Sequence, residues 1–180
     1  MTTRRDFLKT TAALTATLLA PAVSAKPTLE LVQGERQLKF YNLHTGEHLK
    51  ATYWADGVYI PDEMTAINHI LRDFRTGDIK QIDPHLMEVL YRLQHRVEQR
   101  GAFSVISAYR SPKTNAQLHR QSNGVATRSL HMQGKAIDIR LPGVELKHLR
   151  QAALSLHAGG VGYYPKSNFI HVDTGRPRFW

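Results

Sequence analysis

The sequence contains no cysteine in its 180 residues, which excludes disulfide bonds as a source of stability. A domain without disulfides is held by its hydrophobic core, or by a core together with a metal ion. Repeats and low-complexity segments are also absent after residue 26. The sequence has no nucleic-acid-binding motif either, so its formal net charge of +9 does not by itself indicate a nucleic-acid partner.

The sequence also lacks an apolar run long enough to span a membrane, and this holds for its first 25 residues too. A twin arginine, Arg4 and Arg5, precedes a weakly apolar segment that ends in small residues at 22–25. This layout is typical of a bacterial secretory signal, and the arginine pair predicts the twin-arginine route. The apolar segment, 12–20, is shorter than the about 20 residues that span a bilayer. We expect cleavage near Ala25, with an uncleaved anchor as the alternative.

Residues 26–180 then form a single domain, which is long enough to bury a hydrophobic core. We expect it to lie in the periplasm as a monomer, without stable insertion in the membrane. A basic protein there meets anionic polymers, although charge alone does not choose among nucleic acid, lipid and cell wall. Export argues against nucleic acid as the partner.

The spacing of apolar residues predicts an α+β fold for this domain. Two β-rich runs flank the turn at 44–47 and predict a hairpin. Helical spacing follows over 62–75 and again over 84–100, where Asp83 is a natural cap and Pro84 suits the first helical position. Further helices are expected at 112–118 and 146–157, and strands at 102–110, 136–141, 161–164 and 168–173. We therefore expect a small, mostly antiparallel sheet flanked by helices.

The segment "SLHMQGKAIDIR", residues 129–140, places an aspartate inside an apolar run. Because a strand sends alternate side chains to opposite faces, the two isoleucines beside Asp138 would face the core and Asp138 the other side. In "NFIHVD", residues 168–173, the same alternation turns His171 away from the core. If the two strands share a sheet, Asp138 and His171 converge, and His131 in the preceding loop can reach the same point.

Two imidazoles and one carboxylate form a zinc site of the catalytic kind, whose fourth position is free for water. Zinc lowers the pKa of that water from 15.7 towards ~7, which yields a nucleophile at neutral pH. The alternative interpretation is an ordinary surface or hydrogen-bonded pair of His and Asp, since the chain has ten histidines. Spacing alone leaves both interpretations open.

Five motifs resemble those of the zinc D-Ala-D-Ala metallopeptidases, which share a fold with the Hedgehog signalling domain. "SxHxxGxAxD" lies at 129–138, "FIHVD" at 169–173 and "SAYRS" at 107–111. The exported murein endopeptidases are the most similar branch, because "YNLHTGE" at 41–47 and "LRDFRTG" at 71–77 also fit it. The resemblance covers essentially all of the chain after the signal. It implies a zinc-dependent endopeptidase that hydrolyses the peptide cross-links of peptidoglycan with zinc-bound water.

The resemblance also implies roles for particular residues. His131, Asp138 and His171 match the family's three zinc ligands, with one zinc ion per chain. Arg110 matches the arginine that steadies the scissile carbonyl, where a fixed cation can stabilise the oxyanion of the transition state. A structural salt bridge at the end of a strand is the alternative for Arg110.

Two further residues are candidates for binding substrate. Ser129 lies two residues before the first ligand, where it either orients the loop or contacts substrate. Its hydroxyl could equally be a structural cap of the turn. Tyr109, in the "SAYRS" motif, either packs in the core or lines the cleft.

The general base is where the sequence departs from its relatives. VanX-type enzymes carry a glutamate three residues before the last histidine ligand, and here that position is Asn168, which cannot accept a proton. Asp173, on the same strand face as His171, is the best substitute as catalytic base. The alternative role of Asp173 is to orient a ligand histidine.

Three functions follow, all with peptidoglycan as the partner. The first is the murein endopeptidase, which would cut either 4-3 cross-links (D-Ala to diaminopimelate) or 3-3 cross-links (diaminopimelate to diaminopimelate). The second is a D,D-carboxypeptidase that trims terminal D-Ala. The third is a non-catalytic, zinc-containing wall-binding module, which Asn168 keeps open because it replaces the expected base.

Overall fold

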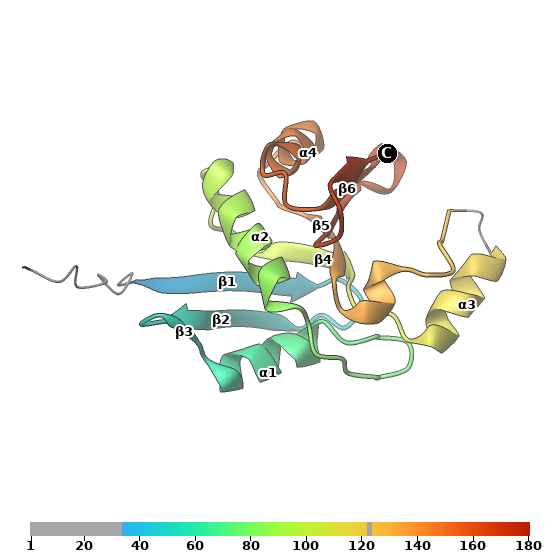
Figure 1. Ribbon diagram of the computed structural model, residues 1–180, viewed down its shortest axis with the longest axis horizontal. Helices are drawn as coiled ribbons and strands as arrows, with labels where there is room; N and C mark the ends of the chain where they lie inside the picture. The colour runs from blue at the N-terminus through green and yellow to red at the C-terminus, as the bar shows by residue number, and fades with distance from the viewer. Residues whose placement is uncertain (1–33, 122–123) are drawn as a thin grey trace, which may run out of the picture. The chain divides into compact units, whose positions relative to one another are not determined.

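The computed structural model describes residues 34–121 and 124–180, and the predicted signal segment, 1–25, lies outside this part. Figure 1 shows the arrangement of its helices and strands, together with two short 3-10 helices, η1 and η2. Along the chain the elements are β1 (Glu35–Asn42), β2 (His48–Ala55), β3 (Val58–Tyr59), α1 (Pro61–Ile70), α2 (Pro84–Arg96), β4 (Phe103–Ser107), α3 (Pro112–Gln121), η1 (Leu130–Gln133), β5 (Ala136–Arg140), α4 (Leu146–Ser155), β6 (Gly160–Tyr164), η2 (Pro165–Ser167), β7 (Phe169–Asp173) and β8 (Arg178–Phe179). Among the described residues, none of the helices has the length and apolar character that a membrane span requires.

The α+β class is confirmed, but the prediction of a small, mostly antiparallel sheet is wrong. The described residues form one eight-stranded sheet in the order β3-β2-β1-β4-β5-β7-β6-β8. The sheet is mixed, because β4 lies parallel to β1 and β8 lies parallel to β6. The β1–β4 pair is parallel since the chain crosses over through β2, β3, α1 and α2 before it returns beside β1.

The predicted hairpin and the predicted second helix are both confirmed. β1 and β2 pair antiparallel, and the turn between them has Gly46 in the left-handed region at φ 72°. The α2 helix begins as expected, with Pro84 in its first turn and the Asp83 carboxylate accepting a hydrogen bond from the His85 N–H at 3.0 Å. Local capping chemistry therefore decides where α2 starts.

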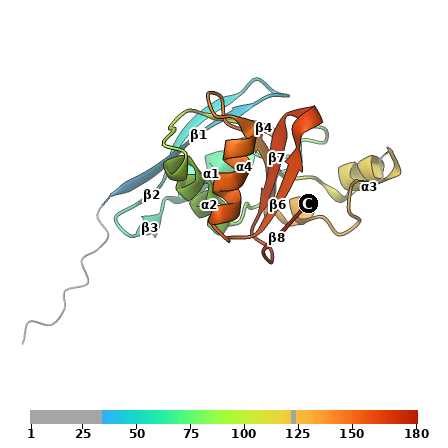
Figure 2. The same cartoon turned by 90° about the horizontal axis from the view of Figure 1, so that it is seen from above.

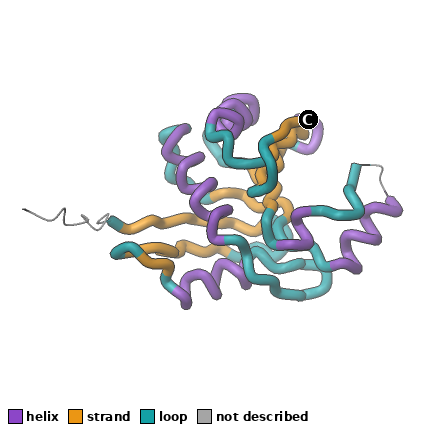
Figure 3. The backbone as a smooth tube through the Cα atoms, viewed as in Figure 1, coloured by secondary structure: helices purple, strands orange, loops and turns teal. Residues whose placement is uncertain are grey.

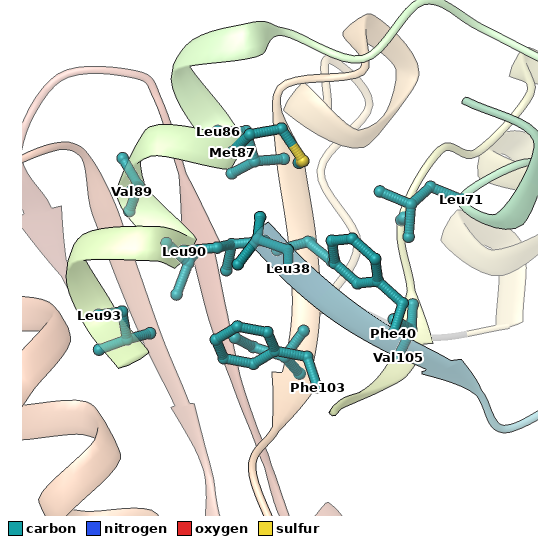
Figure 4. Close-up of a cluster of buried hydrophobic side chains, with 14 of the residues drawn as sticks. Leu38, Phe40, Leu71, Leu86, Met87, Val89, Leu90, Leu93, Phe103 and Val105 are labelled. Atoms are coloured by element: carbon teal, nitrogen blue, oxygen red, sulfur yellow. The ribbon is translucent and has the colours of Figure 1, made fainter. Parts of the chain in front are cut away.

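The hydrophobic core lies where α2 packs against β1 and β4. Figure 4 shows its side chains: Leu38 and Phe40 from β1, Phe103 and Val105 from β4, and a row of leucines from α2. Leu86, Leu90 and Leu93 of that row are fully buried. The residues recur at helical spacing, so they line one face of α2 and fix it on the sheet. Figures 1 and 2 show α4 beside α2, and α4 also contacts β6 and β7.

The strands β5 and β7 pair antiparallel near the middle of the sheet, and the isoleucines on their core-facing side are fully buried. The α3 helix stands away from the sheet in both Figure 1 and Figure 2. Figure 3 shows that loops, rather than strands, gather on the side of the molecule where α3 lies. The polar face of the β5–β7 pair opens towards these loops, since residues 124–126 and the β5–β7 side chains line one cavity.

Candidate metal centre

Three polar side chains meet on adjacent elements of the sheet. Asp138 of β5 and His171 of β7 are direct partners across the antiparallel pair. His131 comes from η1, the short helix just before β5. The three residues are 5 %, 8 % and 1 % exposed, respectively, and one ligand atom from each lies within 4.8 Å of the other two. The structure thus brings together the three residues that the sequence pattern selected.

The "SxHxxG" motif explains how His131 is held. The Ser129 hydroxyl accepts a hydrogen bond from the His131 N–H at 3.3 Å and caps η1. Gly134 ends η1 in the left-handed region at φ 68°, and a Cβ there would lie 2.4 Å from the Gln81 carbonyl oxygen. The motif therefore places a cap before the histidine and a close backbone approach after it.

The hydrogen bonds of each imidazole fix which nitrogen is free. The Nδ1–H of His131 donates to the Ala108 carbonyl oxygen at 2.6 Å. The Nε2–H of His171 donates to the Asp173 carboxylate at 2.9 Å. Since a carbonyl and an ionised carboxylate only accept, the other nitrogen of each neutral ring carries a lone pair.

The two free nitrogens face each other and a carboxylate oxygen. Nε2 of His131 lies 3.1 Å from Nδ1 of His171, and the two nitrogens lie 3.3 Å and 3.0 Å from Oδ1 of Asp138. Three acceptors thus converge without a donor among them, an arrangement that only a proton or a metal cation can satisfy. Ligands bound at 2.0–2.1 Å to a tetrahedral zinc ion lie about 3.3 Å apart. Donor set and spacing therefore both fit zinc.

Electrostatics keep two of these groups in the forms that bind metal. Burial lowers the pKa of His131, so its ring is neutral at pH 7. Burial would raise the pKa of Asp138, but His131 and His171 hold it well below its usual range. The pKa of His171 is raised, because Asp138 and Asp173 outweigh the lowering by burial. A metal entering the site therefore competes with a proton on His171.

Asp173 lies behind His171, and five donors surround its fully buried carboxylate. Oδ1 accepts from the N–H groups of Gly160 and Gly175 at 2.9 and 2.8 Å and from Nη1 of Arg178 at 3.1 Å. Oδ2 accepts from Nη2 of Arg178 at 2.7 Å and from His171. Burial would raise the pKa of Asp173, but His171, Arg178 and the two backbone donors hold it well below its usual range. Asp173 is therefore a saturated, ionised acceptor.

Gly159 and Gly160 lie so close to other atoms near Asp173 that there is no room for a side chain at either position. A Cβ on Gly160 would lie 2.4 Å from Nη1 of Arg178 and 2.5 Å from Oδ2 of Asp173. A Cβ on Gly159 would lie 1.7 Å from the Asp173 carbonyl oxygen. Arg178 and these glycines are functional-site residues that were not predicted from the sequence. The adjacent pair Gly159-Gly160 was the available signal, since consecutive glycines at the start of a strand indicate close backbone approach.

A cavity of about 280 Å³ opens over the three converging residues. Arg110 lines it and is held by two bonds, from Nη2 to Oδ2 of Asp138 at 2.9 Å and from Nε to the Ser107 hydroxyl at 3.0 Å. Trp180 forms another wall, with its indole N–H donating to the Tyr164 hydroxyl at 2.8 Å. The lining residues are Arg110, Gly124, Val125, Ala126, Arg128, Ser129, Leu130, His131, Asp138, Tyr164, Phe169, His171, Arg178 and Trp180.

Three residues named from the sequence are not among those that line the cavity. Tyr109 packs partly buried against the core, and its N–H donates to the Leu71 carbonyl oxygen at 3.0 Å. Asp173 lies beneath His171, as described above. Asn168 is exposed in the left-handed region at φ 54°, between η2 and β7. Asp138 carries the single side-chain carboxylate among the described lining residues.

Comparison with known proteins matches this domain from end to end. The family model described as peptidoglycan L,D-endopeptidase MepK matches residues 30–180. The chain belongs to the MepK family. It is 49% identical over 145 residues to peptidoglycan L,D-endopeptidase MepK of Escherichia coli (strain K12), covering 81% of this chain and 80% of that protein. It is 45% identical over 146 residues to a probable MepK of Haemophilus influenzae, covering 81% of this chain and 78% of that protein.

Membership in the MepK family confirms the predicted relation to the murein endopeptidase branch of metallopeptidases. A second family model, for the twin-arginine translocation signal sequence, matches residues 1–21. That match confirms the predicted export by the twin-arginine route. Two separate family models thus match the chain, one over residues 1–21 and the other over residues 30–180.

Proposed function

We propose that this chain is a zinc-dependent endopeptidase that hydrolyses the peptide cross-links of peptidoglycan in the periplasm, as a monomer that is not held in the membrane. One observation carries the proposal: two imidazole nitrogens and a carboxylate oxygen converge within 4.8 Å beneath an open cavity. Three protein ligands with room for a fourth group are typical of catalytic rather than structural zinc. The names of the relatives supply the substrate class.

The bond cut is proposed to be the one in a 3-3 cross-link. The relatives are named L,D-endopeptidases. In a 3-3 cross-link the scissile bond joins the L-centre of one diaminopimelate to the D-centre of another. In a 4-3 cross-link it joins two D-centres, so the L,D designation favours the 3-3 bond.

His131, Asp138 and His171 would hold the zinc ion. When bound, zinc polarises a carbonyl group and lowers the pKa of water in its open position towards ~7. The chain's own contribution is orientation, because the Ala108 carbonyl and the Asp173 carboxylate fix the two imidazole rings. These two contacts turn the free nitrogen of each ring towards Asp138.

Arg110 is the proposed electrostatic catalyst. Its Nε and Nη2 are occupied by Ser107 and Asp138, and its Nη1 makes no hydrogen bond within residues 34–121 and 124–180. A guanidinium fixed at two nitrogens lines the cavity with its charge in place. Such a cation stabilises the oxyanion that develops when the scissile carbonyl is attacked.

Of the two roles predicted for Asp173, its contacts support the orienting one. Its two oxygens already accept five hydrogen bonds. The ring of His171 lies between Asp173 and the point where the three ligand atoms converge. A carboxylate in this position fixes the tautomer of a ligand histidine and raises its basicity. Ser129, which caps η1 and also lines the cavity, is proposed to position His131.

Digestion of purified sacculi, followed by mass spectrometry of the muropeptides, tests the function. The wild-type protein should convert 3-3 cross-linked dimers to monomers, and a chelator should stop the reaction. His131→Ala and Asp138→Ala should bind no zinc and release no monomers, whereas His148→Ala, an exposed histidine of α4, should behave as wild type. Loss of terminal D-Ala alone would identify a carboxypeptidase instead. One bound zinc with sacculi captured but no bond cut would identify a wall-binding module.

A further inference from the structure

Three arginines line the cavity, and their partners differ. Arg110 pairs with Asp138 at 2.9 Å, and Arg178 pairs with Asp173 at 2.7 Å. Arg128 is exposed and has no hydrogen bond or ion pair with any residue that the structure describes. Among those residues the cavity has one side-chain carboxylate, Asp138, and it is already committed to Arg110 and the two histidines. Arg128 thus brings an uncompensated positive charge to the cavity.

The backbone that carries Arg128 is anchored. The Nδ2 of Asn115, which is 3 % exposed, donates to the carbonyl oxygens of Ala126 and Thr127 at 3.1 and 3.5 Å. On the other side, Ser129 is buried and caps η1. The chain is therefore fixed on both sides of Arg128, three residues before the metal-facing His131. Only the side chain is free to meet a ligand.

The substrate of the proposed reaction carries a charge that suits this arginine. A diaminopimelate that accepts a cross-link is joined through the amine of its D-centre, and that same carbon bears a free carboxylate. The carboxylate therefore lies on the carbon next to the scissile nitrogen, close to the reacting carbonyl. A guanidinium binds such a group through two parallel hydrogen bonds, which gives geometric specificity as well as energy.

We propose that Arg128 is a specificity-determining residue that binds the free carboxylate beside the scissile nitrogen. This inference rests on the proposed endopeptidase function. It predicts that the enzyme distinguishes cross-links in which this carboxylate is free from cross-links in which it is amidated. The discrimination should reside in Arg128, because each of the other two arginines of the cavity already forms an ion pair with an aspartate of the fold.

Two synthetic 3-3 dimers test the inference, one with the free carboxylate and one with a carboxamide in its place. Wild type should cleave the amidated dimer with kcat/KM lower by roughly tenfold to a hundredfold, mostly through KM. Arg128→Gln should cleave both dimers at about the rate of wild type on the amidated one. Arg128→Lys should keep part of the preference, since an ammonium binds without the bidentate geometry.

A matched control is Arg92→Gln, which removes one charge from an exposed position on α2 outside this cavity and should keep the wild-type preference. Equal cleavage of the two dimers by wild type would overturn the role of Arg128 and leave the endopeptidase standing. A preference that survives in Arg128→Gln would also overturn it. If zinc-loaded wild type cleaves neither dimer, the proposed hydrolysis of 3-3 cross-links fails, and the inference fails with it. Residual cleavage of the amidated dimer by Arg128→Gln shows that this variant is folded.

Discussion

The cavity has two sides that are built differently. The strand floor consists of Asp138 and His171, which line the cavity from β5 and β7, and of Asp173, which lies beneath His171; all three residues are at most 8 % exposed. The rim, residues 124–128, is exposed along most of its length. Every polar side chain of the floor is tied to another part of the fold, whereas the rim presents a free cation. This difference fits the proposals above, in which buried strands would bind the metal and an exposed loop, which can vary without disturbing the strands, would select the substrate.

Within the strand floor, two aspartates on adjacent strands have opposite surroundings. Asp138 turns one oxygen to Arg110 and the other to the two histidines that face the open cavity. Asp173 is enclosed by backbone N–H groups and Arg178, and it reaches the site only through His171. The same residue type thus serves as a proposed ligand in one place and as a support in the other.

The largest effect that tests this division is expected from Asp173→Asn. The variant keeps the size of the side chain but removes the charge that orients His171, so zinc affinity should fall by about 10- to 100-fold. Peptidase activity should fall at limiting zinc and recover when zinc is in excess. Zinc affinity is measured by competition with a chromophoric chelator, and Asp78→Asn, at an exposed carboxylate outside the site, is the control.

If Asp173 were instead the catalytic base, Asp173→Asn would change zinc affinity and activity in a different pattern. Zinc affinity would then match that of wild type, while kcat would collapse and no excess of zinc would restore it. That outcome would contradict the orienting role and would make the two aspartates of the strand floor partners in catalysis rather than ligand and support.

The strand floor was largely predictable from the sequence because its signal is local. Alternation within "AIDIR" and "FIHVD" is enough to place Asp138 and His171 on one face, and the structure pairs them directly across the two strands. The Asp83 cap and the apolar face of α2 are local signals as well. Such features depend on residues that lie only a few positions apart in the chain, so a single sequence is enough to predict them.

What the sequence did not reveal depends on contacts between distant residues. The parallel β1–β4 pair joins strands separated by two helices, and β8 has only two residues, too few for a periodic pattern. The role of Arg178 depends on its pairing with a carboxylate that β7 buries, and the exclusion of Tyr109 from the cavity lining depends on how its loop packs. Tertiary packing alone decides these features.

A second prediction compares Gly160, which packs against Asp173 of the strand floor, with Gly124 of the rim. Gly160→Ala places a methyl group 2.5 Å from Oδ2 of Asp173, so the free energy of unfolding should fall by about 1–3 kcal/mol. Gly124→Ala, where no atom of residues 34–121 or 124–180 lies within 4 Å of the new Cβ, should change it by no more than about 0.5 kcal/mol. Neither glycine has a positive φ, so the comparison isolates space from backbone strain. Equal urea unfolding curves for the two variants would show that the strand floor is packed no more tightly than the rim.

The segment that carries Arg110 is part of neither the strand floor nor the rim. It is anchored by Asp73, which lies in the loop after α1. The Ser111 N–H donates to Oδ2 of Asp73 at 2.8 Å, and the Arg75 N–H donates to its Oδ1 at 3.0 Å. Burial would raise the pKa of Asp73, but hydrogen bonds from Thr114, Ser111 and Arg75 outweigh burial and hold it below its usual value. The ionised form of Asp73 therefore stabilises the folded state.

The smallest effect is expected from the pH dependence of this anchor. Because the folded pKa of Asp73 is lowered, its contribution to stability is complete above the unfolded pKa of about 3.9 and is lost as pH falls through the folded value. Asp73→Asn should lower the free energy of unfolding by about 1–2 kcal/mol at pH 6. The gap to wild type should close as pH falls below the unfolded pKa of about 3.9 and through the lower folded value, since wild type alone loses the charge at this position. Urea unfolding of both proteins at each pH measures the gap, and a gap of constant size would show that the Arg110 segment is held by packing rather than by the Asp73 carboxylate.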